Sequence, residues 1–236
     1  MIKIKKFYNC LRNINFYKAY LKGVAPLFEL TELVQKIDNA NSLIDIGSNK
    51  GQFSLIARKF FPGIKIYSFE PQLDELNIQK KILGDHNISY YNLALGSEEK
   101  ILNLYITNRR DSSSLLEPNY KINKNKIYST SEIIKTKVKK LDNIISTNAI
   151  IRPLILKLDV QGYELEVLKG SLNLLKYIDY IITEISFIEI YNNQVSKKEL
   201  TDFLLSNNFK LKSKCNLSKL NKQLFQEDVL FVKDNI

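Results

Sequence analysis

The stretch LIDIGSNKGQF, residues 43–53, is an apolar run that reaches an acid, passes two glycines and continues into a helical pattern. The run has the length of a buried strand, and the apolar residues that follow are spaced as in an amphipathic helix. Gly47 and Gly51 allow the backbone to turn sharply and to approach a ligand closely, because neither carries a Cβ atom. The stretch therefore predicts a strand that turns into a helix at an edge where a sheet binds a ligand.

Strand-like and helix-like segments alternate along most of the chain. The predicted strands are 42–46, 64–69, 88–95, 154–158, 178–186, 209–213 and 228–233, and the predicted helices between them are 52–61, 71–83, 163–175 and 196–207. This alternation is typical of a parallel sheet with helices on both faces. We therefore predict the α/β class: a single Rossmann-like domain with a mostly parallel, seven-stranded sheet and an antiparallel edge strand.

Two regions depart from this alternation. Residues 97–140 form an insertion after the third strand, in which 100–107 and 133–140 alternate as a β-hairpin around a long polar loop. Loops of that length in a compact domain usually carry function. Residues 1–38 form an N-terminal helical extension, with a basic amphipathic helix in the first 25 residues and a second helix from Pro26 to about residue 38. The domain proper then spans 39–236.

The composition is that of a globular enzyme with a basic surface. Of the 236 residues 44% are apolar, and 35 Lys and Arg against 25 Asp and Glu give a net charge of +10. The surplus lies in two blocks: residues 1–28 hold six cations and no acid, and residues 121–140 hold seven lysines against Glu132. Such blocks suit a phosphate-rich partner, an anionic glycan or an acidic membrane surface, or they only keep the surface solvated.

The cysteines and the hydropathy pattern bear on the compartment. Cys10 and Cys215 have neither the spacing of metal ligands nor that of a disulfide framework. No segment approaches the roughly 18 apolar residues of a membrane span, and the charged start lacks the apolar core of a signal peptide. We therefore expect a cytoplasmic protein with free thiols.

The glycine spacing disfavours the two common nucleotide motifs. A dinucleotide fingerprint needs three glycines in six residues, a phosphate-binding P-loop ends in Gly-Lys-Ser/Thr, and residues 43–53 have neither pattern. Asp45 at the strand end would repel a pyrophosphate but could hold an ammonium group. Glu70 ends the next strand and is placed to accept hydrogen bonds from two ribose hydroxyls. S-adenosylmethionine has both an amino-acid end and a ribose, so it satisfies Asp45 and Glu70 together.

Residues 45–54, DIGSNKGQFS, resemble motif I of class I S-adenosylmethionine-dependent methyltransferases, and the chain from about residue 40 onward resembles their FkbM family more closely. The most specific match is LKLDVQGYE at 156–164, followed by EVLKG at 166–170. Further matching segments are FEP at 69–71, ALG at 94–96, DSSSL at 111–115, LD at 141–142, the segment 184–191 and the strand that begins at Asp228. The first 40 residues have no counterpart in this resemblance.

The strand-end pattern and the resemblance together imply a set of cofactor-binding residues at the carboxyl ends of the first four strands. They are Asp45, Gly47, Asn49, Gly51, Phe53, Glu70, Pro71, Asn92, Ala94 and Asp159. Asn92 and Ala94 rest on the resemblance alone, in which the end of the third strand passes the adenine. Phe53 equally suits a place in the core.

Three charged residues are expected to carry the chemistry. Asp159 follows the strand 154–158 and is the predicted general base or orienting group, because a sugar hydroxyl is too weakly acidic to ionise alone at neutral pH. A cap on the next helix is the structural alternative. Lys157 lies on the same side of the strand and, if buried, needs an acidic partner. Glu184 is a second acid or a ligand for a divalent ion such as Mg²⁺, whereas the lack of an accompanying histidine or cysteine disfavours zinc.

A second set of polar residues is expected to contact the methyl acceptor. It consists of Arg109, Ser112, Ser113, Ser114, Glu164 and Tyr191. The serine hydroxyls could hydrogen-bond a polar acceptor and the arginine could bind an anionic one, although the serines equally suit a flexible loop. Glu164 contacts the acceptor or caps a helix, and Tyr191 is nominated by the resemblance.

The predicted function is transfer of a methyl group from S-adenosylmethionine to a hydroxyl of a small molecule, with a sugar of a glycan, glycolipid or secondary metabolite as the preferred acceptor. RNA ribose methylation is the alternative that the +10 charge suggests, and a non-catalytic cofactor-binding module is the third. A small-molecule or glycan acceptor, anionic or neutral, is preferred over nucleic acid. The basic N-terminal helix leaves three roles open: a lid, a homodimer contact or an anchor at a membrane surface.

Overall fold

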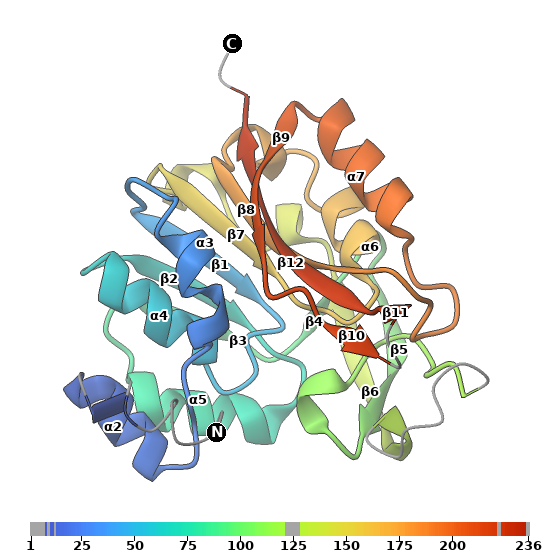
Figure 1. The fold of residues 1–236 in the computed structure, drawn as a ribbon, viewed down its shortest axis with the longest axis horizontal. Coiled ribbons are helices and arrows are strands. Elements are labelled where there is room, and N and C mark those ends of the chain that lie inside the picture. The colour runs from blue at the N-terminus through green and yellow to red at the C-terminus, as the bar shows by residue number, and fades with distance from the viewer. Residues whose placement is uncertain (1–7, 9, 12, 121–127, 221–222, 235–236) are drawn as a thin grey trace.

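A computed structural model describes residue 8 and residues 10–11, 13–120, 128–220 and 223–234. Seven of the described strands form one sheet, in the order β3-β2-β1-β7-β8-β12-β9 (Figure 1). They are β1 (Ser42–Ile46), β2 (Lys65–Phe69), β3 (Ile88–Tyr91), β7 (Leu154–Leu158), β8 (Tyr180–Ser186), β9 (Phe209–Cys215) and β12 (Gln226–Lys233). The predicted α/β class and the seven-stranded sheet are confirmed. β12 runs antiparallel to β8 and to the edge strand β9.

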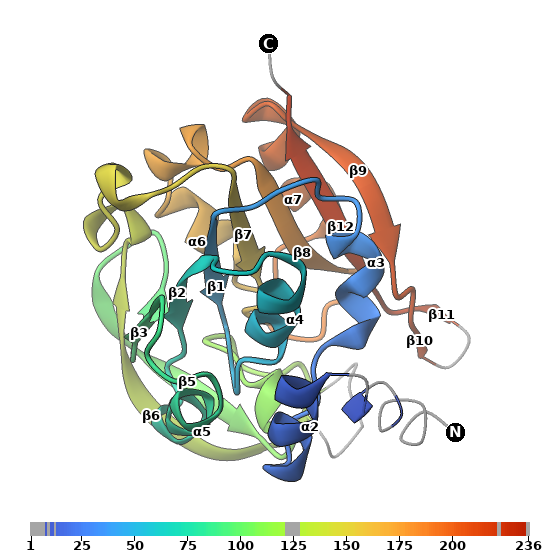
Figure 2. The same ribbon diagram turned by 90° about the vertical axis from the view of Figure 1, so that its left-hand side faces the viewer.

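Helices cover both faces of this sheet (Figure 2). The described helices are α2 (Ile14–Leu21), α3 (Thr31–Val34), α4 (Gln52–Phe60), α5 (Leu73–Leu83), α6 (Glu164–Lys169) and α7 (Lys197–Ser206). Side chains that alternate along β1 enter two separate clusters: Leu43 packs with Phe53 of α4, whereas Ile44 and Ile46 pack with Val167 of α6. The period-2 pattern of a strand thus buries both faces of the sheet.

Local signals explain where several elements end. α7 begins with a capping box, in which the Ser196 hydroxyl and the Glu199 carboxylate bond each other's backbone N–H groups. The predicted helix 163–175 ends at Lys169, because the next residue, Gly170, touches the backbone of Gly96: a Cβ on Gly170 would lie 2.0 Å from the Gly96 oxygen. The helix therefore ends where Gly170 contacts Gly96, the residue just before the insertion 97–140.

The predicted strand 88–95 is divided between two sheets. β3 ends at Tyr91, and Asn92 then donates hydrogen bonds to the carbonyl oxygens of Glu70 and Pro71, at 3.0 Å each. β4 (Ala94–Leu95) pairs with β6 (Thr130–Lys139), which pairs antiparallel with β5 (Lys100–Thr107). The predicted hairpin of the insertion is confirmed. A further short hairpin, β10 (Lys219–Leu220) and β11 (Gln223–Leu224), was not predicted.

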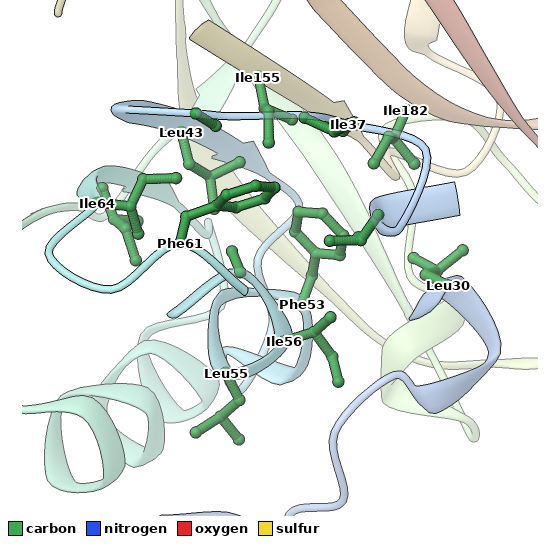
Figure 3. Close-up of a cluster of buried hydrophobic side chains, with 14 of the residues drawn as sticks. Leu30, Ile37, Leu43, Phe53, Leu55, Ile56, Phe61, Ile64, Ile155 and Ile182 are labelled. Carbon is green, nitrogen blue, oxygen red and sulfur yellow. The ribbon is translucent and has the colours of Figure 1, made fainter. Parts of the chain in front are cut away.

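The N-terminal extension packs into the same core as the sheet. Phe16 and Ala19 of α2 and Leu33 of α3 are at most 2% exposed and belong to the cluster of Leu43. Figure 3 shows Leu30, which precedes α3, close to the side chains of this cluster. The second predicted helix is shorter than expected, with one turn of 3₁₀ helix at 28–30 before α3. A lid or dimer role for the extension stays a prediction.

Part of the basic sequence cannot be placed. The first seven residues of the predicted N-terminal helix and the loop lysines at 121, 124 and 126 lie outside the described residues. In the described ranges, no helix is both long and apolar enough to cross a membrane.

Candidate active site

The site is built where three neighbouring strands end. β2, β1 and β7 are adjacent and parallel, and the chain order reverses between β1 and β7. Open α/β sheets bind their ligands at the carboxyl edge beside such a reversal. Gly47, Glu70 and Asp159 are the first residues after β1, β2 and β7. The backbone therefore brings these three residues to one edge without any side-chain contact being needed.

Two hollows open at this edge. The first encloses about 530 Å³, including its open mouth, and we refer to it as the apolar cleft. Its walls are mostly hydrophobic and combine strand ends with the residues after β3 and part of the insertion. The apolar lining residues are Ile46, Phe69, Pro71, Leu93, Ala94, Leu95, Leu104, Leu115, Val160 and Tyr163.

The second hollow encloses about 830 Å³, again including its mouth, and we refer to it as the polar cavity. Its polar and charged lining residues are Glu29, Ser48, Asn49, Gln52, Arg109, Asp111, Ser112, Tyr128, Lys157, Asp159, Gln161, Glu184, Asn216, Gln226 and Asp228. Gly47, Asn49, Asp111 and Asp159 line both hollows. The two spaces therefore meet at the tips of β1 and β7.

Two glycines that the sequence singled out have different roles. Gly47 has a φ of +70°, and a Cβ built on it would lie 1.9 Å from the carbonyl oxygen of Asp159. It lets the tips of β1 and β7 touch at the junction of the hollows. Gly51 has a φ of +81°, and its Cβ would meet Leu83 and Gln79 of α5. The prediction that Gly51 lets a ligand approach closely is not supported by this geometry, because the close neighbours are side chains of α5.

Glu70 lies in the wall of the apolar cleft with its carboxylate held in place. Its two oxygens accept hydrogen bonds from the backbone N–H groups of Asn49 and Gln72, at 2.8 Å each. Burial raises the pKa of Glu70 to about 7, and these two bonds only partly offset that effect. Each carboxylate oxygen can still accept another donor. The predicted position of Glu70 at the ligand edge agrees with this geometry.

Asp45 lies elsewhere than its predicted role requires. It is fully buried, accepts a hydrogen bond from the Ser54 hydroxyl at 2.7 Å, and has Lys157 Nζ 3.9 Å from its other oxygen. It is not among the described lining residues of either hollow. Burial raises its pKa, against the effect of Lys157. The expectation that Asp45 holds an ammonium group is therefore corrected: in this structure it supports Lys157 from inside the sheet.

Lys157 links Asp45 to Asp159. Its Nζ donates to Asp159 Oδ2 at 3.1 Å, which confirms the predicted acidic partner. Burial lowers the pKa of Lys157, but the charges of Asp159 and Asp45 outweigh burial and the pKa is raised. Asp159 also accepts a bond at 2.8 Å from Gln161 Nε2 and keeps one third of its side chain exposed. Its carboxylate is thus oriented from two sides and open toward both hollows.

Glu184 lies beside another carboxylate in the lining of the polar cavity. It lies directly opposite Asp228 in the register of β8 and β12, and it accepts a hydrogen bond from Gln226. Burial and the nearby charges of Asp159 and Asp228 raise the pKa of Glu184 well above its usual range. Burial likewise raises the pKa of Asp228 to about 6. Glu184 therefore lies in the cavity as predicted, as part of an acidic wall.

The predicted acceptor residues of the insertion mostly hold the loop together. The Ser113 hydroxyl donates to the Arg110 carbonyl oxygen, and the Ser114 hydroxyl donates to the Gln161 carbonyl oxygen, at 2.8 Å each. Arg109 forms an ion pair with Asp111 at 2.7 Å. Of the three serines, Ser112 lines the polar cavity, whereas the other two line the apolar cleft. The loop thus forms a wall of both hollows, with most of its donors already used.

Of four further predicted residues, Tyr191, Glu164 and Asn92 are not in the lining of the two hollows, whereas Phe53 is. Tyr191 is 1% exposed and donates from its hydroxyl to the Ser112 carbonyl oxygen at 2.5 Å. Glu164 accepts hydrogen bonds from the N–H groups of Val160 and Gly162, in the turn before α6, and burial raises its pKa to about 7. Asn92 fixes the turn after Glu70, as described above. Phe53 is 1% exposed and packs in the core (Figure 3), and it also lines the polar cavity.

Sequence reasoning missed several residues that shape the site. Gln161 holds Asp159 and is itself bonded at 3.1 Å by the Tyr191 hydroxyl; its place inside LKLDVQGYE was a usable signal. Asp228 stood in a matched segment without an assigned role. Tyr163, also inside LKLDVQGYE, and Gln72, which follows the matched segment FEP, line the apolar cleft.

The apolar cleft fits S-adenosylmethionine. The hydrophobic walls suit a purine, the Glu70 carboxylate suits ribose hydroxyls, and Gly47 lets the tips of β1 and β7 touch where the cleft ends at the junction. Ala94 and Pro71 lie in these walls as predicted. Within the described residues, no group of three or more His, Cys, Asp or Glu side chains is arranged to hold a metal ion, and Mg²⁺ dependence stays a prediction.

Comparisons with known proteins agree with this geometry. The model of the FkbM methyltransferase domain matches residues 45–211. The chain is 25% identical over 202 residues to the hexuronic acid methyltransferase AglP of Haloferax volcanii, covering 86% of this chain and 74% of that one. It is also 25% identical over 144 residues to Methyltransferase 1 of Beauveria bassiana, covering 54% and 57%.

A solved structure is similar in fold alone. A candidate S-adenosylmethionine-dependent methyltransferase of Listeria monocytogenes superposes with a TM-score of 0.50 at 11% identity, over 88% of this chain and 98% of that one. The family match extends over most of the domain and includes the ends of β1, β2, β3, β7 and β8. The chain therefore belongs to the FkbM family of class I S-adenosylmethionine-dependent methyltransferases.

Proposed function

We propose that this methyltransferase transfers its methyl group to a hydroxyl oxygen of a sugar or a similarly hydroxylated small molecule. The observation that carries the proposal is the position of Asp159. Its carboxylate lies at the junction of the apolar cleft and the polar cavity and is oriented by Lys157 and Gln161. A general base for transfer to oxygen has to lie within hydrogen-bond reach of the acceptor hydroxyl at the place where that hydroxyl faces the methyl donor, which is the junction.

The bound cofactor would supply the methyl group as part of a sulfonium. Glu70 would accept hydrogen bonds from the ribose, and the apolar walls around Phe69 and Leu95 would enclose the base. A carboxylate oxygen of Asp159 would take the proton of the acceptor hydroxyl while the hydroxyl oxygen bonds to the methyl carbon; the bond from that carbon to sulfur would break and S-adenosylhomocysteine would leave. Lys157 and Gln161 would keep the carboxylate aimed at the junction, so that positioning contributes much of the rate enhancement.

The lining of the polar cavity supports a polyhydroxylated acceptor. Amide, hydroxyl and carboxylate groups from separate segments converge there, and such groups hydrogen-bond sugar hydroxyls well. Among the described lining residues, the five carboxylates outnumber the two cations, Arg109 and Lys157, and each cation already pairs with a carboxylate. This balance favours a neutral acceptor over a polyanion, and it disfavours RNA. That a 25% identical relative is named for hexuronic acid supports the sugar class.

The proposal can be tested in two steps. Calorimetric binding of S-adenosylmethionine and S-adenosylhomocysteine first establishes that the purified protein holds the cofactor. It is then incubated with the cofactor and separate panels of neutral sugars, uronic acids, hydroxylated polyketides and RNA, and methylated products are identified by mass spectrometry. Methylation of a hydroxyl in the small-molecule panels is expected. Transfer only to RNA, or cofactor binding without transfer to any panel, would overturn the proposal in favour of one of the two alternatives.

A further inference from the structure

One surface of the molecule is not used by the proposed function: the solvent-facing side of α2 and its flanking residues. Leu11, Ile14, Lys18, Leu21 and Lys22 are exposed along this side, and we refer to them as the outer face of α2. Ile14 and Leu21 are 63% and 67% exposed, and Leu11 is 49% exposed. Within α2, Ile14, Lys18 and Leu21 are spaced four and three residues apart and so lie on one side of the helix, whereas Leu11 precedes the extended N-cap Asn13 and Lys22 is the C-cap residue.

The opposite side of α2 is fixed to the core. Phe16 and Ala19 are buried, and the Asn13 side chain caps the helix by accepting bonds from the N–H groups of Asn15 and Phe16. The buried side therefore fixes α2 against the core, and Ile14 and Leu21 remain exposed in the folded protein. None of the described residues from 8 to 24 lines the apolar cleft or the polar cavity, so this face is not a wall of the site.

Of the described residues from 13 to 28, the charged ones are Lys18 and Lys22, both cations. Residues 1–28 carry six cations and no acid, two of the cations being Lys18 and Lys22. A helix that shows aliphatic side chains beside lysines binds at the interface of a membrane, where the apolar groups enter the headgroup layer and the cations meet anionic lipids. A symmetric dimer through the same face would bring each set of cations against its own copy without any acid between them.

We propose that the outer face of α2 docks this protein on an anionic membrane surface. The inference goes beyond the proposed function and does not depend on it, because it rests on α2 alone. In Figures 1 and 2, α2 lies at the end of the sheet where β1 and β7 end. Leu27 and Glu29, which follow α2 along the chain, line the polar cavity. Docking through α2 therefore turns the substrate end of the molecule toward the bilayer.

The test uses the full chain and lipid vesicles. Sedimentation with phosphatidylcholine vesicles is compared with sedimentation on vesicles that also contain phosphatidylglycerol. The variant Ile14→Ser/Lys18→Gln/Leu21→Ser removes two exposed aliphatic groups and one cation from the outer face. The matched control, Leu172→Ser/Lys176→Gln/Leu205→Ser, removes the same groups from exposed positions elsewhere on the surface. Thermal unfolding and calorimetric binding of S-adenosylhomocysteine report whether each variant stays folded.

We expect the wild type to bind vesicles that contain phosphatidylglycerol and to bind phosphatidylcholine alone far less, with binding weakened by added salt. The outer-face variant should bind at least about tenfold less tightly, whereas the control should bind as the wild type does. Equal binding by the two variants, or no vesicle binding by the wild type, would overturn the proposal. So would a wild-type dimer that the outer-face variant loses, because the face would then be a contact between two copies.

Discussion

The apolar cleft and the polar cavity share four lining residues, yet different parts of the chain build them. The cleft follows the ends of β1, β2 and β7 and the segment just after β3, so its shape is set mainly by backbone positions. The cavity is assembled from side chains of segments around residues 27–30, 109–112, 157–161, 184 and 216–228. Where backbone geometry sets a site, a single substitution should abolish ligand binding. Where contacts between loops set it, each substitution should weaken ligand binding only in part. The predictions below test that difference.

The largest effect is expected at the junction of the two hollows. Gly47→Ala introduces a Cβ 1.9 Å from the backbone oxygen of Asp159 at a φ of +70°. Left-handed strain of about 1–2 kcal/mol adds to overpacking of about 1–3 kcal/mol, so the free energy of unfolding should fall by about 3 kcal/mol. Binding of S-adenosylhomocysteine, measured by calorimetry, should be lost, because either β1 or β7 has to move.

A variant of a second glycine, Gly63, measures the cost of left-handed backbone strain without a steric collision. Gly63 has a φ of +83°, and a Cβ there would meet nothing within 4 Å. Gly63→Ala should therefore cost only the strain, about 1–2 kcal/mol in chemical denaturation, and leave cofactor affinity unchanged. Equal losses of affinity in the two variants would mean that the backbone contact between Gly47 and Asp159 does not define the cleft.

The next effect is on the reaction itself. Asp159→Asn keeps the shape of the side chain but removes its capacity to take a proton, so kcat should fall by at least about 100-fold. Affinity for S-adenosylhomocysteine should change little, since Glu70 and the apolar walls are intact. Asp228→Asn, across the polar cavity, is the matched control and should lower kcat far less. A similar fall in both variants would show that the acidic wall as a whole, rather than the junction residue, supports transfer.

The strand ends explain why the cofactor side could be predicted and where the prediction failed. Glu70 and Asp159 each follow the last residue of a strand, so their side chains reach the edge of the sheet. Asp45 lies one residue inside β1, where side chains stand over a sheet face instead, and it meets Ser54 of α4. The predicted strand 42–46 has the bounds of β1, and the acid-glycine pattern locates the turn, but Asp45 is the residue before the last of the strand and therefore faces the interior.

The acceptor side could not be predicted in the same way. The Tyr191 hydroxyl bonds the Ser112 carbonyl, 79 positions away along the chain, and the Ser114 hydroxyl bonds the Gln161 carbonyl, 47 positions away. No local periodicity encodes contacts between segments so far apart. The serines were predicted as acceptor ligands because hydroxyls suit sugars, and the tertiary structure uses two of these hydroxyls to hold the insertion instead.

The pH dependence of cofactor binding is expected to show a smaller effect on the cleft side. With its pKa near 7, about a tenth of Glu70 is ionised at pH 6 and about nine tenths at pH 8. The ionised carboxylate is the form that only accepts hydrogen bonds, as ribose hydroxyls require, so affinity should rise with pH. Binding of S-adenosylhomocysteine should strengthen about tenfold over this range. Glu70→Gln should bind more weakly throughout and show a flat profile; a slope that persists in this variant would assign the titration to another group.

The smallest effect is expected from the outer support of the polar cavity. Tyr191→Phe removes the hydroxyl that joins the Ser112 carbonyl oxygen to Gln161 Oε1. Because the site is buried, the loss should lower the free energy of unfolding by about 1–2 kcal/mol. Once an acceptor is identified, its KM should rise a few-fold while affinity for S-adenosylhomocysteine is unchanged, since the loosened loop borders the cavity and Gln161 still holds Asp159.

Tyr67→Phe is the control that isolates this effect. Tyr67 is also buried, and its hydroxyl donates to the Ala149 carbonyl oxygen at 2.7 Å, away from the lining of both hollows. Its loss should cost a similar free energy of unfolding without changing the acceptor KM. If the two variants raise KM equally, the acceptor site responds to stability in general. If only Tyr191→Phe raises the acceptor KM, that KM depends on the contacts that hold the insertion against the polar cavity. This result is expected for a cavity whose walls come from separate loops.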